Sequence, residues 1–212
     1  MGNTSSDHNI KDALEELSDC RKIKTLEDAF WTSYFQSSTM PVEQLLEMVS
    51  LDDIRQIKSK NRSNFVTLCL HCMTQIFKSC KNSFWSQRHL LTVNNSVKWL
   101  IRLFPAVLED KEMINYLWET KNDACLQPHA HCLLQNICEL LFRQGYTVAQ
   151  TTDAVYPPDP FNTQIIWKPG LVVTEATESN TFLDENRKLL LCLLLLLLSQ
   201  ELYLTRDGYI FP

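Results

Sequence analysis

The sequence predicts an all-α fold of antiparallel helix pairs, arranged either as an α-solenoid of the armadillo or HEAT type or as an irregular helical bundle. Apolar residues recur every three to four positions over most of the chain, which is the period of an amphipathic helix. Only four of the 212 residues are glycine, which argues against a turn-rich β-sandwich. No repeat of fixed period occurs, so the solenoid alternative depends on the succession of helix pairs alone.

Residues 1–24 are expected to form an N-terminal segment with one weak amphipathic helix, whose apolar face comprises Ile10, Ala13, Leu14 and Leu17. The pattern Thr25-x-x-Asp28 then predicts a capping box at the start of a helical domain over residues 25–144. The aromatic residues after it are expected to lie in the core rather than in a ligand site: Phe30, Trp31, Tyr34 and Phe35.

Two shorter helices are predicted next. Pro41 can open the first of them, because proline is favoured at the first helical position. Ser50 is expected to cap the second, which ends near Lys58.

The centre of the chain has the clearest helix patterns. Three stretches, beginning at Phe65, Leu90 and Leu126, keep the helical period for at least four turns each. Pro105 should kink or terminate the second of them. A short helix is predicted after Glu109 and Asp110.

The period fails over residues 145–180, where several prolines predict an irregular loop much longer than an ordinary connection. It returns in residues 181–212, with Thr181 in a second capping box and a helix through Glu201. Residues 189–198 are all apolar, which is too short a run to cross a membrane because that takes about 20 residues. They predict a core helix wrapped by its neighbours. The apolar chain end suggests that a longer protein continues beyond it.

The first six residues match the N-myristoylation pattern. Removal of Met1 would expose the amine of Gly2, and Ser6 supplies the hydroxyl side chain that the pattern requires. An unmodified, disordered tip is the alternative. A single myristoyl chain binds membranes weakly and reversibly, so a second signal would be needed.

Basic residues and one cysteine are candidates for that second signal. Each basic side chain would add up to about 1 kcal/mol at an anionic membrane surface, although an ordinary solvated face is the alternative. Cys20 could carry a palmitate or remain unmodified. The basic candidates are Arg21, Lys22, Lys24, Arg55, Lys58, Lys60 and Arg62.

Several classes of function are disfavoured. The net charge of −5, with scattered basic residues, argues against nucleic-acid binding. The chain has no nucleophile-elbow motif and no phosphate-binding loop, so we expect no enzymatic activity, cofactor or small-molecule substrate. A secretory signal peptide is not evident, so the eight cysteines are expected to be reduced.

Cys69 and Cys72 form a lone C-x-x-C pair that suggests a zinc site as one alternative. They also fall on the apolar stripe of Phe65 and Ile76, where cysteine packs as a small hydrophobic residue. Core packing is therefore the preferred interpretation, and no metal is expected. The residues that could complete a zinc site are His129, His131 and Cys132.

Four segments carry a family resemblance: DAFWTSYF at 28–35, VLEDKEMINYLW at 107–118, IWKPG at 166–170, and NRKLLL at 186–191 leading to ELYL at 201–204. With the Met-Gly start, they resemble in the same order the N-terminal part of the high-temperature-induced dauer-formation family, which is related to dymeclin. The leucine run and the loop from Gly145 depart from the family pattern. Any partner site in that loop cannot be carried over.

The resemblance implies a non-enzymatic, myristoylated, all-helical protein on the cytoplasmic side of Golgi and trans-Golgi membranes. Its expected role is that of a scaffold in secretory sorting and dense-core vesicle formation, with protein partners bound on helical surfaces. Gly2 is the functional residue that the resemblance carries over. The alternative is a soluble cytosolic helical adaptor without a lipid anchor.

Overall fold

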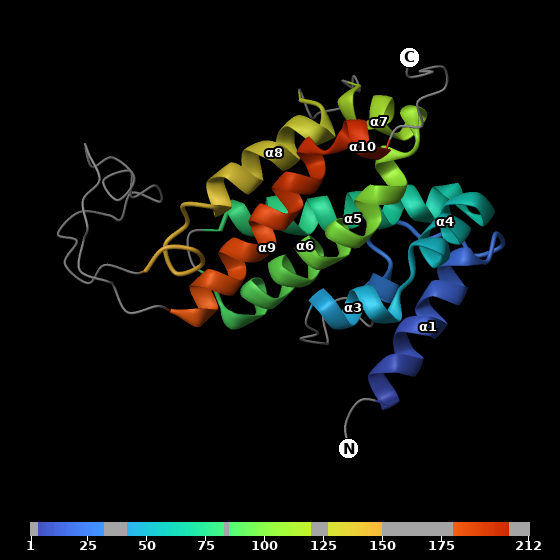
Figure 1. The fold of residues 1–212 in the computed structure, drawn as a ribbon. Helices are drawn as coiled ribbons and strands as arrows, with labels where there is room; N and C mark the ends of the chain where they lie inside the picture. Colours follow the sequence, from blue (N-terminus) through green and yellow to red (C-terminus); the bar gives the residue numbers. More distant parts are fainter. Residues whose placement is uncertain (1–3, 32–41, 83–84, 120–126, 150–179, 204–212) are drawn as a thin grey trace, which may run out of the picture.

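The computed structural model describes residues 4–31, 42–82, 85–119, 127–149 and 180–203 (Figure 1). The regular structure within these ranges is α-helical, apart from an isolated β-bridge between Gln144 and Val148, so the all-α prediction is confirmed. The helices are α1 (Thr4–Ser18), α3 (Val42–Met48), α4 (Leu51–Lys60), α5 (Arg62–Cys80), α6 (Gln87–Leu108), α7 (Lys111–Trp118), α8 (His129–Leu140), α9 (Thr181–Leu198) and α10 (Gln200–Tyr203).

Antiparallel helix pairs are present as predicted. Arg62 at the start of α5 forms an ion pair with Asp110 just beyond the end of α6, with 3.6 Å between Nη2 and Oδ2, so these two helices run in opposite directions. Ala130 near the start of α8 and Leu197 near the end of α9 line the same hollow, so α8 and α9 also run in opposite directions. Helix α8 packs on α5, and α9 packs on α6. One pair therefore lies on the other (Figure 1).

Helix α6 is the centre of the core. It contacts α3, α4, α5, α7, α9 and α10. Removing its apolar stripe from water stabilises the fold by about 25 cal/mol per Å² of apolar surface buried. The stripe includes Val97, Leu100, Leu103 and Val107, each 0% exposed.

Ser50 caps α4 as predicted. Its Oγ accepts the backbone N–H of Asp53 at 3.1 Å, and the Asp53 carboxylate accepts the backbone N–H of Ser50 at 2.8 Å. This reciprocal pair satisfies two backbone donors that a helix start otherwise leaves without partners. Asp110, the second residue of the predicted acidic pair, caps α7 by accepting the backbone N–H groups of Glu112 and Met113.

The other two predicted caps are wrong, the first by three positions and the second by one. Asp28, rather than Thr25, accepts the N–H of Phe30 at 2.9 Å. The Thr25 carbonyl accepts the N–H of the Trp31 indole. Asn180, rather than Thr181, accepts the N–H of Leu183 and starts α9.

Of the two predicted effects of Pro105, termination of the helix does not occur. Helix α6 continues to Leu108, because a proline in the last turn removes a single backbone donor while the carbonyl of Pro105 still accepts the N–H of Glu109 at 3.2 Å. Helix α8 begins at His129, directly after Pro128. The predicted starts at Pro41 and Leu126, and residues 150–179 of the irregular segment, lie outside the described residues.

The prediction that the leucine-rich helix is wrapped on every side is wrong. Leu190 and Leu193 are 0% exposed, whereas Leu195 and Leu198 are 63% and 72% exposed. Helices α6 and α8 cover one side of α9, and the opposite side faces outward. The predicted helix through Glu201 is also divided at Ser199 into α9 and α10.

Candidate functional site at the N-terminal helix

The predicted lipidation residue, Gly2, lies outside the described residues. Helix α1 begins two positions later, at Thr4. A group attached to Gly2 would therefore be joined to the fold through α1. How firmly that group is held to the domain depends on how α1 packs against its neighbours.

The predicted apolar face of α1 does hold it to the core. Ala13, Leu14 and Leu17 are 4%, 7% and 0% exposed, and Ile10 packs at the edge of the same core. Helix α1 packs against α4 and α5.

Two buried asparagines at the start of α5 bind the chain that leaves α1. The side-chain amide of Asn64 donates to the carbonyl of Leu17 at 3.0 Å and to that of Lys22 at 2.7 Å. Its oxygen accepts the N–H of Lys24 at 2.8 Å. Asn61 donates to the same turn. These bonds fix the end of α1 to α5, because a buried amide that lost them would be left without partners.

Sequence reasoning missed both asparagines. The available signal was two asparagines three positions apart at a predicted helix start, which is compatible with a cap but does not reveal the segment that they bind.

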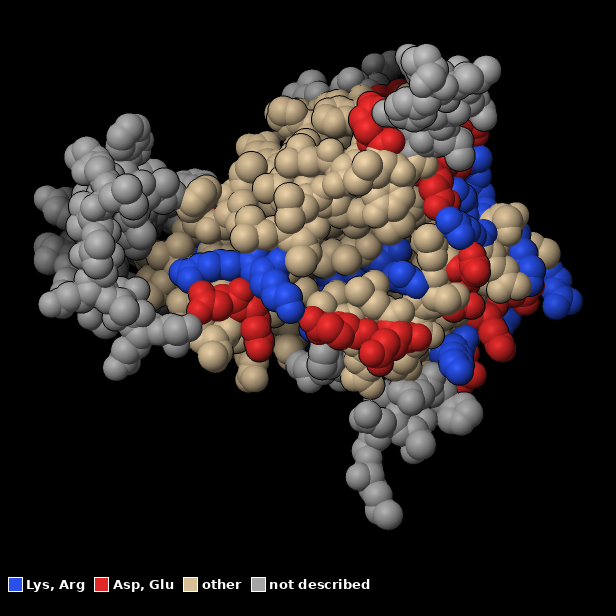
Figure 2. Space-filling model, in the orientation of Figure 1, with Lys and Arg blue, Asp and Glu red and all other residues tan. Residues whose placement is uncertain are grey.

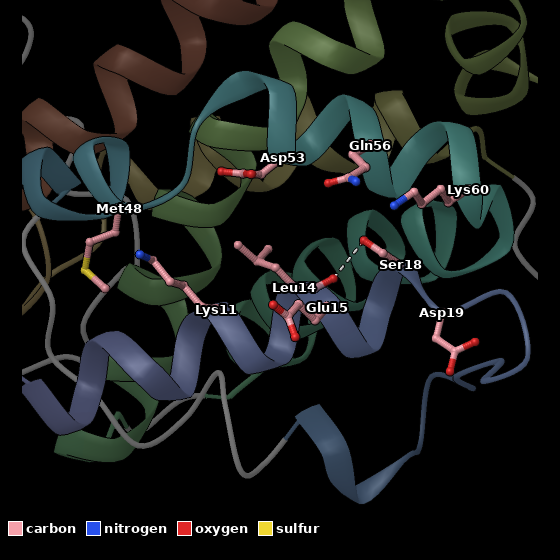
Figure 3. A pocket seen from close by; sticks show the side chains of 9 residues that line it. All are labelled: Lys11, Leu14, Glu15, Ser18, Asp19, Met48, Asp53, Gln56 and Lys60. Atoms are coloured by element: carbon pink, nitrogen blue, oxygen red, sulfur yellow. Dashed lines mark hydrogen bonds between the residues drawn. The ribbon is translucent and has the colours of Figure 1, made fainter.

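A groove of about 380 Å³ lies between α1 and α4 (Figure 3). The Ser18 hydroxyl in it donates to the carbonyl of Leu14 at 2.9 Å, and Asp53 is engaged as the partner of Ser50 in the α4 cap. The lining carries charges of both signs and no nucleophile beside a base, so these residues offer no catalytic arrangement. The lining residues are Lys11, Leu14, Glu15, Ser18, Asp19, Met48, Asp53, Gln56 and Lys60.

Most of the basic residues considered as a second membrane signal face acidic partners. Arg55 binds Glu109 with 2.5 Å between Nη2 and Oε1, which raises the pKa of the guanidinium above its usual value. Arg62 binds Glu112 at 3.0 Å.

The other basic candidates with described partners follow the same pattern. Lys24 lies 2.5 Å from Glu16, Arg21 lies 3.3 Å from Asp19, and Lys58 lies 3.9 Å from Asp110. In Figure 2, Lys and Arg lie beside Asp and Glu over the lower part of the visible face, and the part above it is largely uncharged. Paired charges attract an anionic membrane less than free cations do, because each carboxylate cancels part of the field.

Cys69 and Cys72 lie in the core, as the preferred interpretation predicts, and each is 1% exposed. Burial raises the pKa of Cys69 to about 12 and also raises that of Cys72. Within the described ranges, no group of three His, Cys, Asp or Glu residues is placed to hold a metal ion.

Cys20 is exposed, as palmitoylation would require.

The expected aromatic core is confirmed for Phe30 and Trp31, whereas Tyr34 and Phe35 lie outside the described residues. Trp31 stacks on His71 with 4.8 Å between ring centroids and donates from Nε1 to the carbonyl of Thr25 at 2.6 Å. Burial lowers the pKa of His71. This shift favours the neutral imidazole in the core.

Among the helices of the described ranges, none combines the length and the apolar character needed to span a bilayer.

Residues 1–209 match the family described as high-temperature-induced dauer-formation protein. The chain is 26% identical to Protein HID1 of Homo sapiens, 25% identical to Protein HID1 of Mus musculus and 24% identical to a Hid-1 family protein of Schizosaccharomyces pombe. These alignments cover 96%, 96% and 98% of this chain, but 28%, 28% and 26% of the relatives. The chain thus spans just over a quarter of the length of these curated relatives. No solved structure matches it significantly.

Proposed function

The chain belongs to the high-temperature-induced dauer-formation protein family, and from this premise we propose that it is a non-enzymatic, peripheral membrane protein myristoylated on Gly2. It acts on the cytoplasmic side of the Golgi and trans-Golgi network. There it serves as a helical scaffold in secretory protein sorting and dense-core vesicle formation. The membrane and the process are those that the family resemblance implies.

The myristoylation pattern, which extends from Met1 into the first turn of α1, carries the proposal. Helix α1 is fixed by the buried side chains of Leu14 and Leu17 and by the bonds of Asn64 to the turn that follows. A lipid on Gly2 would therefore hold the whole helical domain at the membrane.

The anchoring is weak and reversible. One myristoyl chain gives an association constant of about 10⁴ M⁻¹, and the paired state of Arg55, Arg62 and Lys24 limits electrostatic support. Exchange between the membrane and the cytosol is the expected behaviour, as suits a scaffold recruited during vesicle formation.

Myristate labelling tests the proposal. Cells expressing the chain are fed an alkyne analogue of myristate, and we measure labelling, pelleting with membranes and overlap with a trans-Golgi marker. Gly2→Ala should abolish labelling and reduce both pelleting and overlap. Ser5→Ala, at a position that the pattern leaves free, is the matched control and should behave as the wild type.

The soluble adaptor without a lipid is the competing function, and the outward leucines of α9 favour it because they offer a surface for protein contacts. An intact mass without the acyl group, together with unchanged pelleting of Gly2→Ala, would establish that alternative.

A further inference from the structure

The hollow where α6, α7, α8 and α9 meet has the size of one aromatic ring. It measures about 140 Å³, and a dry apolar cavity of about 150 Å³ holds a benzene molecule. Its lining among the described residues is apolar apart from Gln200. Trp118 and Leu198 belong to this lining and are 50% and 72% exposed, so the hollow opens to the surface. A large apolar side chain can enter it from outside.

The described part of the chain ends beside this hollow. Gln200 opens α10, and Tyr203 ends it about 5 Å further along the helix axis. Residues 204–212 follow with the sequence LTRDGYIFP and lie outside the described residues. Nine residues span up to about 30 Å when extended. This segment is therefore long enough to return to the hollow.

The sequence of this segment predicts a reversal followed by large apolar residues. Asp207-Gly208 is a dipeptide typical of two-residue turns, and Tyr209-Ile210-Phe211 comes directly after it. Pairing across such a turn sets Phe211 opposite Leu204. Because Leu204 directly follows α10, this position lies about one helical turn from Gln200.

We propose that residues 204–212 fold back along α10 and place the ring of Phe211 in the hollow. The phenyl ring suits the apolar lining, because it has no polar atom that needs a hydrogen-bond partner. The contact also covers Trp118 and Leu198, and removing this apolar surface from water is favourable.

The covalent link favours this segment over a separate partner. A short link holds a segment near its site at an effective concentration of millimolar order. A second copy of the chain or a lipid must compete with that concentration to enter the hollow. Leu191 and Leu195 stand earlier in α9, do not line the hollow and stay exposed in this arrangement.

Photo-crosslinking of the unacylated 212-residue chain tests the position of the segment. Phe211 is replaced by p-azidophenylalanine, the protein is irradiated, and the joined peptides are identified by mass spectrometry. Cross-links should join position 211 to Leu117 and Leu134 in a product of the 24.7 kDa chain mass. Their yield should not change on dilution, because the contact is intramolecular. The same replacement at Phe182, which is 42% exposed at the start of α9, is the matched control and should not reach these residues.

Quenching of Trp118 fluorescence tests the burial. The emission of Trp118 is obtained as the difference between each protein and its Trp118→Phe counterpart. Phe211→Asp should raise acrylamide quenching of this emission at least about twofold, because a charged side chain does not stay in an apolar hollow and the indole is uncovered. Thr205→Asp adds the same charge to the same segment but keeps its apolar residues, so it should quench as the wild type does. Circular dichroism verifies that both variants keep the helical fold.

Three results would overturn the proposal. The first is the absence of cross-links between position 211 and the lining residues. The second is cross-linking confined to a product of twice the chain mass, which would assign the hollow to a second copy. The third is equal quenching of Trp118 in the wild type and in Phe211→Asp.

Discussion

The guanidinium carbon of Arg143 lies 4.8 Å from the centroid of the Trp85 indole. The Arg143 side chain also donates from Nη1 to the carbonyl of Cys80 at 2.9 Å and from Nη2 to the carbonyl of Asn82. Trp85 in turn packs against Tyr146, with 5.1 Å between ring centroids. One arginine after α8 thus holds the connection between α5 and α6.

Arg143→Met should lower the free energy of unfolding by about 2–3 kcal/mol, because two carbonyls lose a charged donor in a nearly buried position. Urea denaturation followed by circular dichroism measures the change. Arg21→Met is the control, since Arg21 is 86% exposed and its removal should cost less than about 0.5 kcal/mol. Equal losses in the two variants would contradict the assigned role of Arg143.

Tyr146→Phe should cost about 1–2 kcal/mol although it removes a single oxygen. The hydroxyl donates to the side chain of Asn94 at 2.7 Å, whose amide donates to Asn186 at 3.0 Å. Asn186 closes the ring by donating to the carbonyl of Tyr146 at 2.9 Å. The oxygen of Asn94 would lose its donor, so thermal unfolding should occur at a lower temperature. An unchanged midpoint would show that the Tyr146 hydroxyl contributes nothing to stability.

The hydrogen-bonded ring of Asn94, Tyr146 and Asn186 also shows why sequence patterns do not predict every residue of the core. Apolar periodicity locates α6 because its buried positions repeat. Polar side chains in a core follow no period, since each depends on a partner brought from far along the chain. Asn94 and Asn186 are 92 positions apart.

The stability of the protein should fall as the pH drops below 6.5, in part through His71. Burial lowers the pKa of His71 from 6.5, so the unfolded chain binds a proton that the folded chain resists. Stability from this group is present above pH 6.5 and is lost as the pH falls through the folded pKa, with a slope of at most about 1.4 kcal/mol per pH unit.

His71→Gln should reduce this slope, which urea denaturation at a series of pH values measures. The fluorescence of Trp31 should report the same step, because the two rings stack at 4.8 Å. His131→Gln is the control, since His131 is exposed. A slope that is equal in wild type and His71→Gln would rule out this contribution.

Alkylation should divide the cysteines into two groups. Iodoacetamide should modify the exposed Cys20, Cys138 and Cys192 of the folded protein quickly. Cys69 and Cys80 should react only after unfolding, because burial raises the pKa of each to about 12 and blocks access. Mass spectrometry of peptides gives the rates. Protection that chelators remove would instead indicate a bound metal.

The leucine run shows a different limit of sequence reasoning. Because residues 189–198 are nearly all leucine, the sequence offers no polar positions to mark the outer side of the helix. Leu193 is 0% and Leu195 is 63% exposed although they are two positions apart in the same run. Only the placement of α6 and α8 separates them. The caps at Asp28 and Asn180 differ from the prediction for a related reason, since each competes with a threonine close by in sequence.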